Sequence, residues 1–246
     1  MAGMRQWFHG LTSAGLSGSL ARNPIAVVAI VLRPAHSSAV STLARDPTAP
    51  SAVRGPAAIS VHIADSLSAL ALDCVRDATA IADLGSGAGF PGVVLAIALP
   101  SARVALVESA ARKCAFLARL RTAAAVGNAE IVQARVEEWR AGHGSRDLVV
   151  ARALAPLAVL CEYAAPLLVS GGFLVAWKGA VAAAEALAGS RAAATLGLAA
   201  HGAVRSEPYA GSVAHQFVIY RKIAPTPPGF PRRAGLARKR PLGTEE

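Results

Sequence analysis

The chain has 246 residues, of which 54% are apolar and 16% are charged, and its 25 lysines and arginines exceed its 15 acidic residues to give a formal charge of +10. A chain this apolar buries enough surface to offset the entropy lost on ordering, so disorder throughout is excluded and one globular domain with tails is expected. The longest uncharged run, residues 85–102, contains four glycines and two prolines, which excludes a continuous membrane-spanning helix there.

The excess positive charge lies at the two ends of the chain. Residues 1–60 carry five arginines against one aspartate, and residues 221–246 carry seven basic residues against two glutamates, which leaves a net charge of +1 for residues 61–220. Basic ends on a near-neutral centre favour a polyanionic partner such as nucleic acid, although a solubilising excess of charge is the alternative. We divide the chain into an amino-terminal extension or cap (1–60), a central domain (61–222) and a basic proline-rich tail (223–246).

The spacing of apolar residues predicts an alternation of helices and strands. Near the amino terminus, the apolar run 25–32 is expected to be a helix or strand packed on the domain, because the charge and proline that follow it argue against a signal peptide. The predicted helices cover 61–72, 92–99, 109–126, 156–168 and 180–196, and the predicted strands cover 79–84, 103–107, 129–133, 147–151, 172–177 and 216–221. Ser109 is expected to cap its helix, which Gly127 terminates.

Strands that alternate with helices predict a doubly wound, mostly parallel α/β sheet. The last strand, 216–221, has no helix after it and is expected to close the sheet edge in the antiparallel sense. Beyond Lys222, five prolines predict an extended tail whose basic residues are free to reach phosphates.

The strongest local signal is the run DLGSGAGFPG at residues 83–92. Gly87, Gly89 and Gly92 satisfy the dinucleotide pattern G-x-G-x-x-G, but Pro91 interrupts it and Gly85 remains a surplus glycine. The alternative pattern, D-x-G-x-G-x-G, is typical of methyltransferases that bind S-adenosylmethionine. A structural turn without a ligand is the third interpretation.

Acidic residues follow the neighbouring strands where a nucleoside would lie. In an open parallel sheet the ligand sits beyond the carboxyl ends of the strands, so Glu108, which ends the second strand, is expected to accept hydrogen bonds from ribose hydroxyls. Residues 136–138 follow the third strand, where an acid or amide commonly lies near the adenine.

Several ordered segments resemble one family, the ribosomal RNA small subunit methyltransferase G family, also called glucose-inhibited division protein B. The segments are HIADSL, GSGAGFPG, ESAARKCAFL, QARVEEW, VVARALAPL, GGFLVAWKG and PRRAGLARKRPL. The resemblance runs from about residue 46 to residue 242. Residues 1–45 lack the Asn-Leu-Thr-bearing helical entry usual in the family.

The resemblance implies a seven-stranded sheet of the class I S-adenosylmethionine-dependent methyltransferase type. It implies a cytoplasmic enzyme that transfers a methyl group from S-adenosylmethionine to N7 of a guanine in the decoding-region loop of 16S ribosomal RNA. Its partner would be that RNA or the small ribosomal subunit, with no DNA or membrane, and we expect a monomer.

The resemblance also assigns most of the cofactor site by position. It implies that Gly85 and Phe90 border the cofactor, that Val136 and Glu137 lie at the adenine, and that Arg152 ends the fourth strand at the pocket. Gly87 belongs to the same glycine-rich turn, and Glu108 comes from the strand-end argument above.

Guanine N7 carries an unprotonated lone pair at neutral pH, so no general base and no catalytic residue are predicted. Arg152 is expected to hold a cofactor carboxylate or a phosphate, or else to form a salt bridge with Glu137 or Asp147. Lys178 either positions the guanine through O6 or is a solvated helix-cap residue.

The spacing of the three cysteines indicates no metal site. A non-catalytic RNA-binding assembly factor and a small-molecule methyltransferase remain the alternative functions. The intact glycine-rich turn favours an enzyme over the first, and the basic ends favour an RNA substrate over the second.

Overall fold

The computed structural model describes residues 56–209, 212 and 214–244, and for residues 56–60 the backbone only. Nearly all of the expected amino-terminal extension, including the apolar run 25–32, lies outside the described residues. Within the described part of the chain, no helix is both long and apolar enough to cross a membrane.

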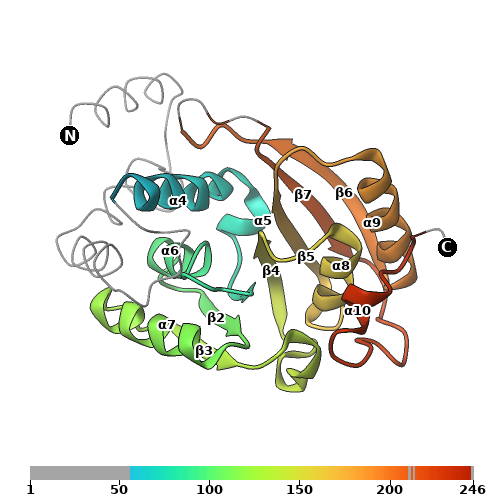
Figure 1. Cartoon of the computed structure of the whole chain (residues 1–246), viewed down its shortest axis with the longest axis horizontal. Coiled ribbons are helices and arrows are strands. Elements are labelled where there is room, and N and C mark those ends of the chain that lie inside the picture. Colours follow the sequence, from blue (N-terminus) through green and yellow to red (C-terminus); the bar gives the residue numbers. More distant parts are fainter. Residues whose placement is uncertain (1–55, 210–211, 213, 245–246) are drawn as a thin grey trace.

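A seven-stranded sheet forms the centre of the molecule (Figure 1). Its strands are β1 (Ala80–Leu84), β2 (Arg103–Glu108), β3 (Ala129–Gln133), β4 (Arg146–Arg152), β5 (Leu168–Lys178), β6 (Leu198–Arg205) and β7 (Gln216–Lys222). Their order is β3-β2-β1-β4-β5-β7-β6, in which the first five are parallel and β7 is antiparallel to both of its neighbours. The predicted fold class, a mostly parallel seven-stranded α/β sheet, is confirmed.

Helices cover both faces of this sheet. They are α4 (Pro56–Ser68), α5 (Asp73–Arg76), α6 (Gly92–Ala98), α7 (Ala111–Ala123), α8 (Leu157–Ala164), α9 (Ala183–Thr195) and α10 (Leu236–Lys239). Side chains alternate along each strand, so Ile81 faces one core, with α4–α7, and Ala82 faces the other, with α8–α10. Because β1, β2 and β4 are parallel, their carboxyl ends lie at the same end of the sheet, and the loops that follow them meet there. We call this end of the sheet the site edge.

The sequence did not predict β6, and β7 is not the edge strand that it suggested. β6 pairs with β7 and forms the edge itself. Its sequence, LAAHGAVR, has few residues of high β-propensity, and only Leu198 is fully buried, because an edge strand has one neighbour and little cover. The buried run of β7 sits between two strands and gave the stronger signal.

Both predicted ends of α7 were also wrong. Ala110 rather than Ser109 precedes the helix, and no side chain caps it; instead the Ala110 N–H donates to the Glu108 carboxylate at 2.8 Å. At the other end the chain turns at Ala125, whose φ is +51°, two residues before Gly127. An acid from the preceding strand replaces the expected cap.

The carboxyl-terminal part of the chain is not the extended tail that its prolines suggested. Residues 230–243, which we call the carboxyl-terminal segment, lie against α8 and include the short helix α10, with Ala237 buried (Figure 1). Prolines prevent a long helix here, but specific side-chain contacts dock the segment.

Candidate functional site

The glycine-rich turn leaves β1 with its backbone in the left-handed region. Gly85 has φ +67° and Gly87 has φ +52°, values that cost an L-residue about 1–2 kcal/mol. The Gly85 and Ser86 N–H groups both donate to the Val107 carbonyl of β2, at 2.8 and 3.1 Å. The turn is therefore fixed to the neighbouring strand.

The turn is packed on one side and open on the other. A Cβ added at Gly85 would lie 2.6 Å from Leu154 Cδ1, whereas the nearest atom to one added at Gly87 is the Gly85 carbonyl oxygen at 3.5 Å. The backbone at Gly87 can thus be approached closely by a ligand.

Asp83, at the end of β1, supports this turn from within the core. Its side chain is only 1% exposed, and its Oδ2 accepts a hydrogen bond from the Gly92 N–H at 3.1 Å. Burial raises the pKa of this carboxyl from its ordinary 3.8 to about 6, although hydrogen bonds from Ser86 and Gly92 oppose the shift. Asp83 therefore holds the start of α6 against the turn rather than facing a ligand.

Glu108 ends β2 beside the turn, as the sequence predicted. Its Oε2 accepts from the Gly87 N–H at 3.2 Å and its Oε1 from the Ala110 N–H at 2.8 Å, while Lys113 Nζ lies 3.7 Å from Oε2. The residue is 6% exposed. Each carboxylate oxygen has a further lone pair, so this oriented group can still accept bonds from ligand hydroxyls.

Arg152 and Phe90 lie together at the end of β4. The Arg152 guanidinium carbon lies 5.6 Å from the centroid of the Phe90 ring, and Nη1 donates to Asp65 Oδ2 at 2.8 Å. The salt-bridge partner is thus Asp65 of α4, not Glu137 or Asp147 as the sequence suggested. Within the described residues, Arg152 Nε and Nη2 have no acceptor, so they can bind an anion.

Val136 and Glu137 form a short 3-10 turn after β3 (Val136–Glu138). Glu137 points its carboxylate away toward the carboxyl-terminal segment, where Oε1 accepts from the Gly235 N–H at 2.8 Å. In the part of the chain that the structure describes, the backbone N–H groups of Val136 and Glu137 donate to no acceptor. The groups left for a ligand here are these two amides and the Val136 side chain.

Lys178 fits neither of the roles considered from sequence. Its Nζ lies 2.6 Å from Glu185 Oε1 and donates to the Ala155 carbonyl at 3.2 Å, and the side chain is 17% exposed. It is committed to the loop between β4 and α8, where Ala153 has φ +53°. Strain of this kind often marks a functional loop.

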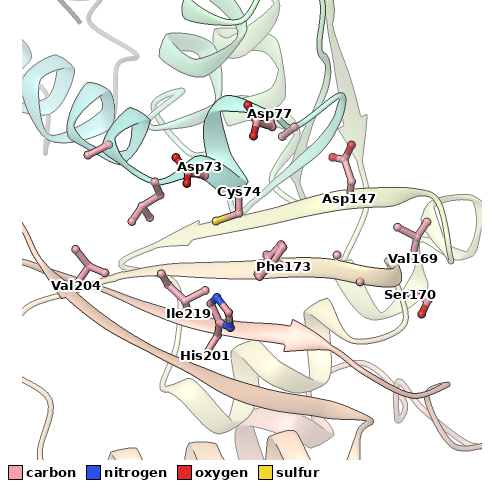
Figure 2. Close-up of a pocket in the computed structure, with 15 residues that line it drawn as sticks. Asp73, Cys74, Asp77, Asp147, Val169, Ser170, Phe173, His201, Val204 and Ile219 are labelled. Carbon is pink, nitrogen blue, oxygen red and sulfur yellow. The ribbon is translucent and has the colours of Figure 1, made fainter. Parts of the chain in front are cut away.

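A cavity of about 760 Å³ lies elsewhere, between α5 and the sheet (Figure 2). Asp147, Phe173 and His201 line it, but none of the predicted site residues does. Asp147 lies in the first part of β4 and Arg152 ends it, so this cavity is remote from the glycine-rich turn. The Asp147 carboxylate is already occupied by Thr79 and Ala80. Within the described residues, no cluster of three or more His, Cys, Asp or Glu side chains is placed to hold a metal ion.

Comparison with known proteins identifies the family. The sequence profile of rRNA small subunit methyltransferase G (GidB) matches residues 51–207. The chain belongs to the rRNA small subunit methyltransferase G family. The methyltransferase G of Rubrobacter xylanophilus is 42% identical over 187 residues, which cover 74% of this chain and 72% of the relative. That of Pelotomaculum thermopropionicum is 40% identical over 196 residues, which cover 78% and 82%.

A solved structure agrees with the fold. A predicted O-methyltransferase from Agrobacterium tumefaciens superposes with a TM-score of 0.51 at 23% identity, covering 67% of this chain and 81% of that one. As a member of the methyltransferase G family, the protein uses S-adenosylmethionine. The site fits this cofactor: a left-handed glycine turn open at Gly87, an oriented carboxylate at Glu108, two unpaired amides at 136–137 and the free guanidinium nitrogens of Arg152 share the site edge.

Sequence reasoning missed two residues of this edge. Asp65 orients Arg152 from α4, and Leu154 packs against Gly85. Asp65 lies in the segment HIADSL and Leu154 in the segment VVARALAPL, both of which carried the family resemblance, so a signal existed for each.

Proposed function

We propose that this protein is a 16S rRNA (guanine-N7)-methyltransferase, which transfers the methyl group of S-adenosylmethionine to a guanine of the decoding-region loop. The observation that carries the proposal is the intact turn at 85–89, with Glu108 hydrogen-bonded to Gly87, in a member of this family. A factor that had lost catalysis would not need a cofactor site, so the intact turn with its oriented carboxylate supports an enzyme over such a factor.

The roles of individual residues follow from what each group offers. Gly85, Gly87 and Phe90 border the methionine part, and Arg152 binds its carboxylate through the free guanidinium nitrogens. Glu108 accepts hydrogen bonds from the ribose hydroxyls. Val136 packs on the adenine ring, and the amides of Val136 and Glu137 donate to its ring nitrogens.

The chemistry makes few demands on the protein. When bound, the cofactor supplies an electrophilic methyl group on a sulfonium sulfur. Guanine N7 already presents an in-plane lone pair and holds no proton, so no side chain has to remove one. The residues of the chain bind, orient and exclude water, effects that supply about 7–11 kcal/mol in well-oriented reactions. The methylation rate at saturating substrate is therefore expected to be flat between pH 6.5 and 8.5.

We also propose that the protein acts as a monomer in the cytoplasm, on RNA rather than DNA and away from membranes. We assign residues 61–222 to the methyl-transfer domain, residues 1–60 to an amino-terminal extension or cap, and residues 223–246 to a basic end. Two basic ends on a near-neutral centre support an RNA substrate over a small molecule.

The test is to incubate the full chain with isotopically labelled S-adenosylmethionine and unmethylated 16S ribosomal RNA, both free and in assembled small subunits. Label in the RNA should map to one decoding-region guanine by N7-specific strand cleavage. RNA that binds without acquiring label would favour a non-catalytic assembly factor. Label that appears only in small molecules would favour a small-molecule methyltransferase.

A further inference from the structure

The carboxyl-terminal segment is anchored by a buried ion pair. Glu162 of α8 is fully buried, and its carboxylate accepts from the backbone N–H of Arg232 at 3.1 Å, from Nε at 2.9 and 3.1 Å, and from Nη2 at 2.5 Å. Arg232 Nη2 also donates to the Arg240 carbonyl at 2.9 Å, which closes the segment on itself. The segment therefore has a fixed position on the domain.

This position adjoins the cofactor site at two points. The Gly235 N–H donates to Glu137, in the turn that we assign to the adenine, at 2.8 Å. Arg238 Nη2 donates to the carbonyl of Leu154 at 2.9 Å. The Leu154 side chain in turn packs against the backbone of Gly85. One residue thus separates the segment from the glycine-rich turn.

The basic side chains that remain point outward. Arg233, Lys239 and Arg240 are exposed, and in the part of the chain that the structure describes their side chains have no acidic partner. No acidic residue occurs between Arg221 and Thr244. The segment therefore presents uncompensated positive charge at a fixed place beside the loop that follows β4.

We propose that residues 230–243 are the RNA-docking edge of the methyl-transfer site, and that Arg233, Lys239 and Arg240 bind phosphates of the nucleotides flanking the target guanine. The inference rests on the proposed function and names the surface that presents the RNA to it. Because Glu162 already holds the segment in place, the segment loses less conformational entropy on binding RNA than a free tail would. Phosphate contacts release counterions from the RNA, so the affinity should depend strongly on salt concentration.

The test compares two variants that remove equal charge. Arg233→Gln with Arg240→Gln removes two cations of the segment. The control, Arg103→Gln with Arg221→Gln, removes two exposed arginines near the opposite edge of the sheet, where β2 begins and β7 ends. Binding of a decoding-region RNA hairpin is measured by fluorescence anisotropy at several salt concentrations, and binding of S-adenosylmethionine by calorimetry.

The segment variant should bind RNA more weakly than the parent. Its slope of log affinity against log salt should be shallower by about 0.7–0.9 for each RNA phosphate that the variant no longer neutralises. The control should keep the parent slope, and both variants should keep the parent affinity for S-adenosylmethionine. A segment variant with the slope of the control, in a protein that still methylates RNA, overturns this inference alone. A parent that neither binds nor methylates RNA overturns the proposed function as well.

Discussion

Gly87 carries the clearest single-residue test of the cofactor site. Gly87→Val and Gly144→Val place the same branched side chain at nearly the same left-handed φ, +52° and +57°, with no protein atom closer than 3.5 Å in either case. Each should lower the free energy of unfolding by at least about 1–2 kcal/mol. Only Gly87→Val should abolish S-adenosylmethionine binding in calorimetry. Equal affinities for S-adenosylmethionine in the two folded variants would show that the cofactor does not bind at this turn.

Glu108 combines two structural bonds with the proposed ribose contact. Glu108→Gln keeps the shape of the side chain but removes the charge and replaces one accepting oxygen by an NH2 group, so the side chain can no longer accept from both Gly87 and Ala110. We expect cofactor affinity to fall by about 1.5–3 kcal/mol, which is roughly 10- to 150-fold in the dissociation constant. Glu130→Gln, at an exposed position on β3, is the control for the removal of negative charge. A dissociation constant within twofold of the parent would make Glu108 a purely structural residue.

Asp83 should give stability a pH dependence of unusual sign. Because burial raises the pKa of this acid from 3.8 to about 6, the folded protein holds the proton more tightly than the unfolded chain does. Its contribution to the free energy of unfolding is unaffected below about pH 4, falls as the pH rises through 4–6, and is lower by about 3 kcal/mol above pH 6.

Asp83→Asn removes this titration and keeps an oxygen that can accept from Gly92. Between pH 4 and pH 7 the free energy of unfolding of the parent should therefore fall relative to that of the variant by about 2–2.5 kcal/mol. Urea unfolding of both proteins at the two pH values measures this change in the free energy of unfolding. All other titratable groups are the same in the parent and the variant, so their contributions cancel. Parallel behaviour would mean that Asp83 titrates normally.

The sequence predicted the buried strands well, but it missed the edge strand and misplaced one helix end, for physical reasons. Strands β1 to β5 have buried apolar residues, and their positions were predicted to within a few residues. β6 was missed because an edge strand with seven partly or fully exposed residues shows no apolar period. The end of α7 was misplaced because the chain turns at Ala125, an alanine in a conformation that glycine usually adopts.

The misplaced end of α7 yields a stability test. Ala125 is exposed and has φ +51°, so Ala125→Gly removes backbone strain without leaving a cavity. The relief of about 1–2 kcal/mol exceeds the entropy that glycine adds to the unfolded chain, about 0.5–1 kcal/mol. The free energy of unfolding should rise by about 0.5–1 kcal/mol in urea titration. Ala118→Gly, at an exposed position inside the same helix, should lower it, and a fall in both variants would contradict this account of the helix end.

Across the whole molecule, the sequence predicted the site edge but not what holds it together. The turn was found from its glycine pattern, Glu108 because strand ends converge in a parallel sheet, and Arg152 from the family resemblance. The pairs Asp65–Arg152 and Glu162–Arg232 join residues 87 and 70 positions apart, and no local pattern records such a pairing. For the same reason a proline-rich basic end looked free when it is in fact docked.

The docked end should contribute strongly to stability. Arg232→Met leaves Glu162 as an uncompensated buried carboxylate, which is expected to lower the free energy of unfolding by about 3–5 kcal/mol. Arg233→Met, one residue away and exposed, should change it by no more than about 0.5 kcal/mol. Urea unfolding of the two variants compares a buried and an exposed arginine of the same segment.

A second substitution separates the ion pair from simple packing. Adding Glu162→Met to Arg232→Met leaves no buried charge, so the double variant should regain most of the stability that the single variant lacks. Cofactor affinity should fall in Arg232→Met, because release of the segment also frees Glu137 and Leu154 at the two sides of the site. If Arg232→Met matched Arg233→Met in both stability and cofactor affinity, the segment would not be anchored by Glu162, and the outward cations would lose the fixed position on which RNA docking depends.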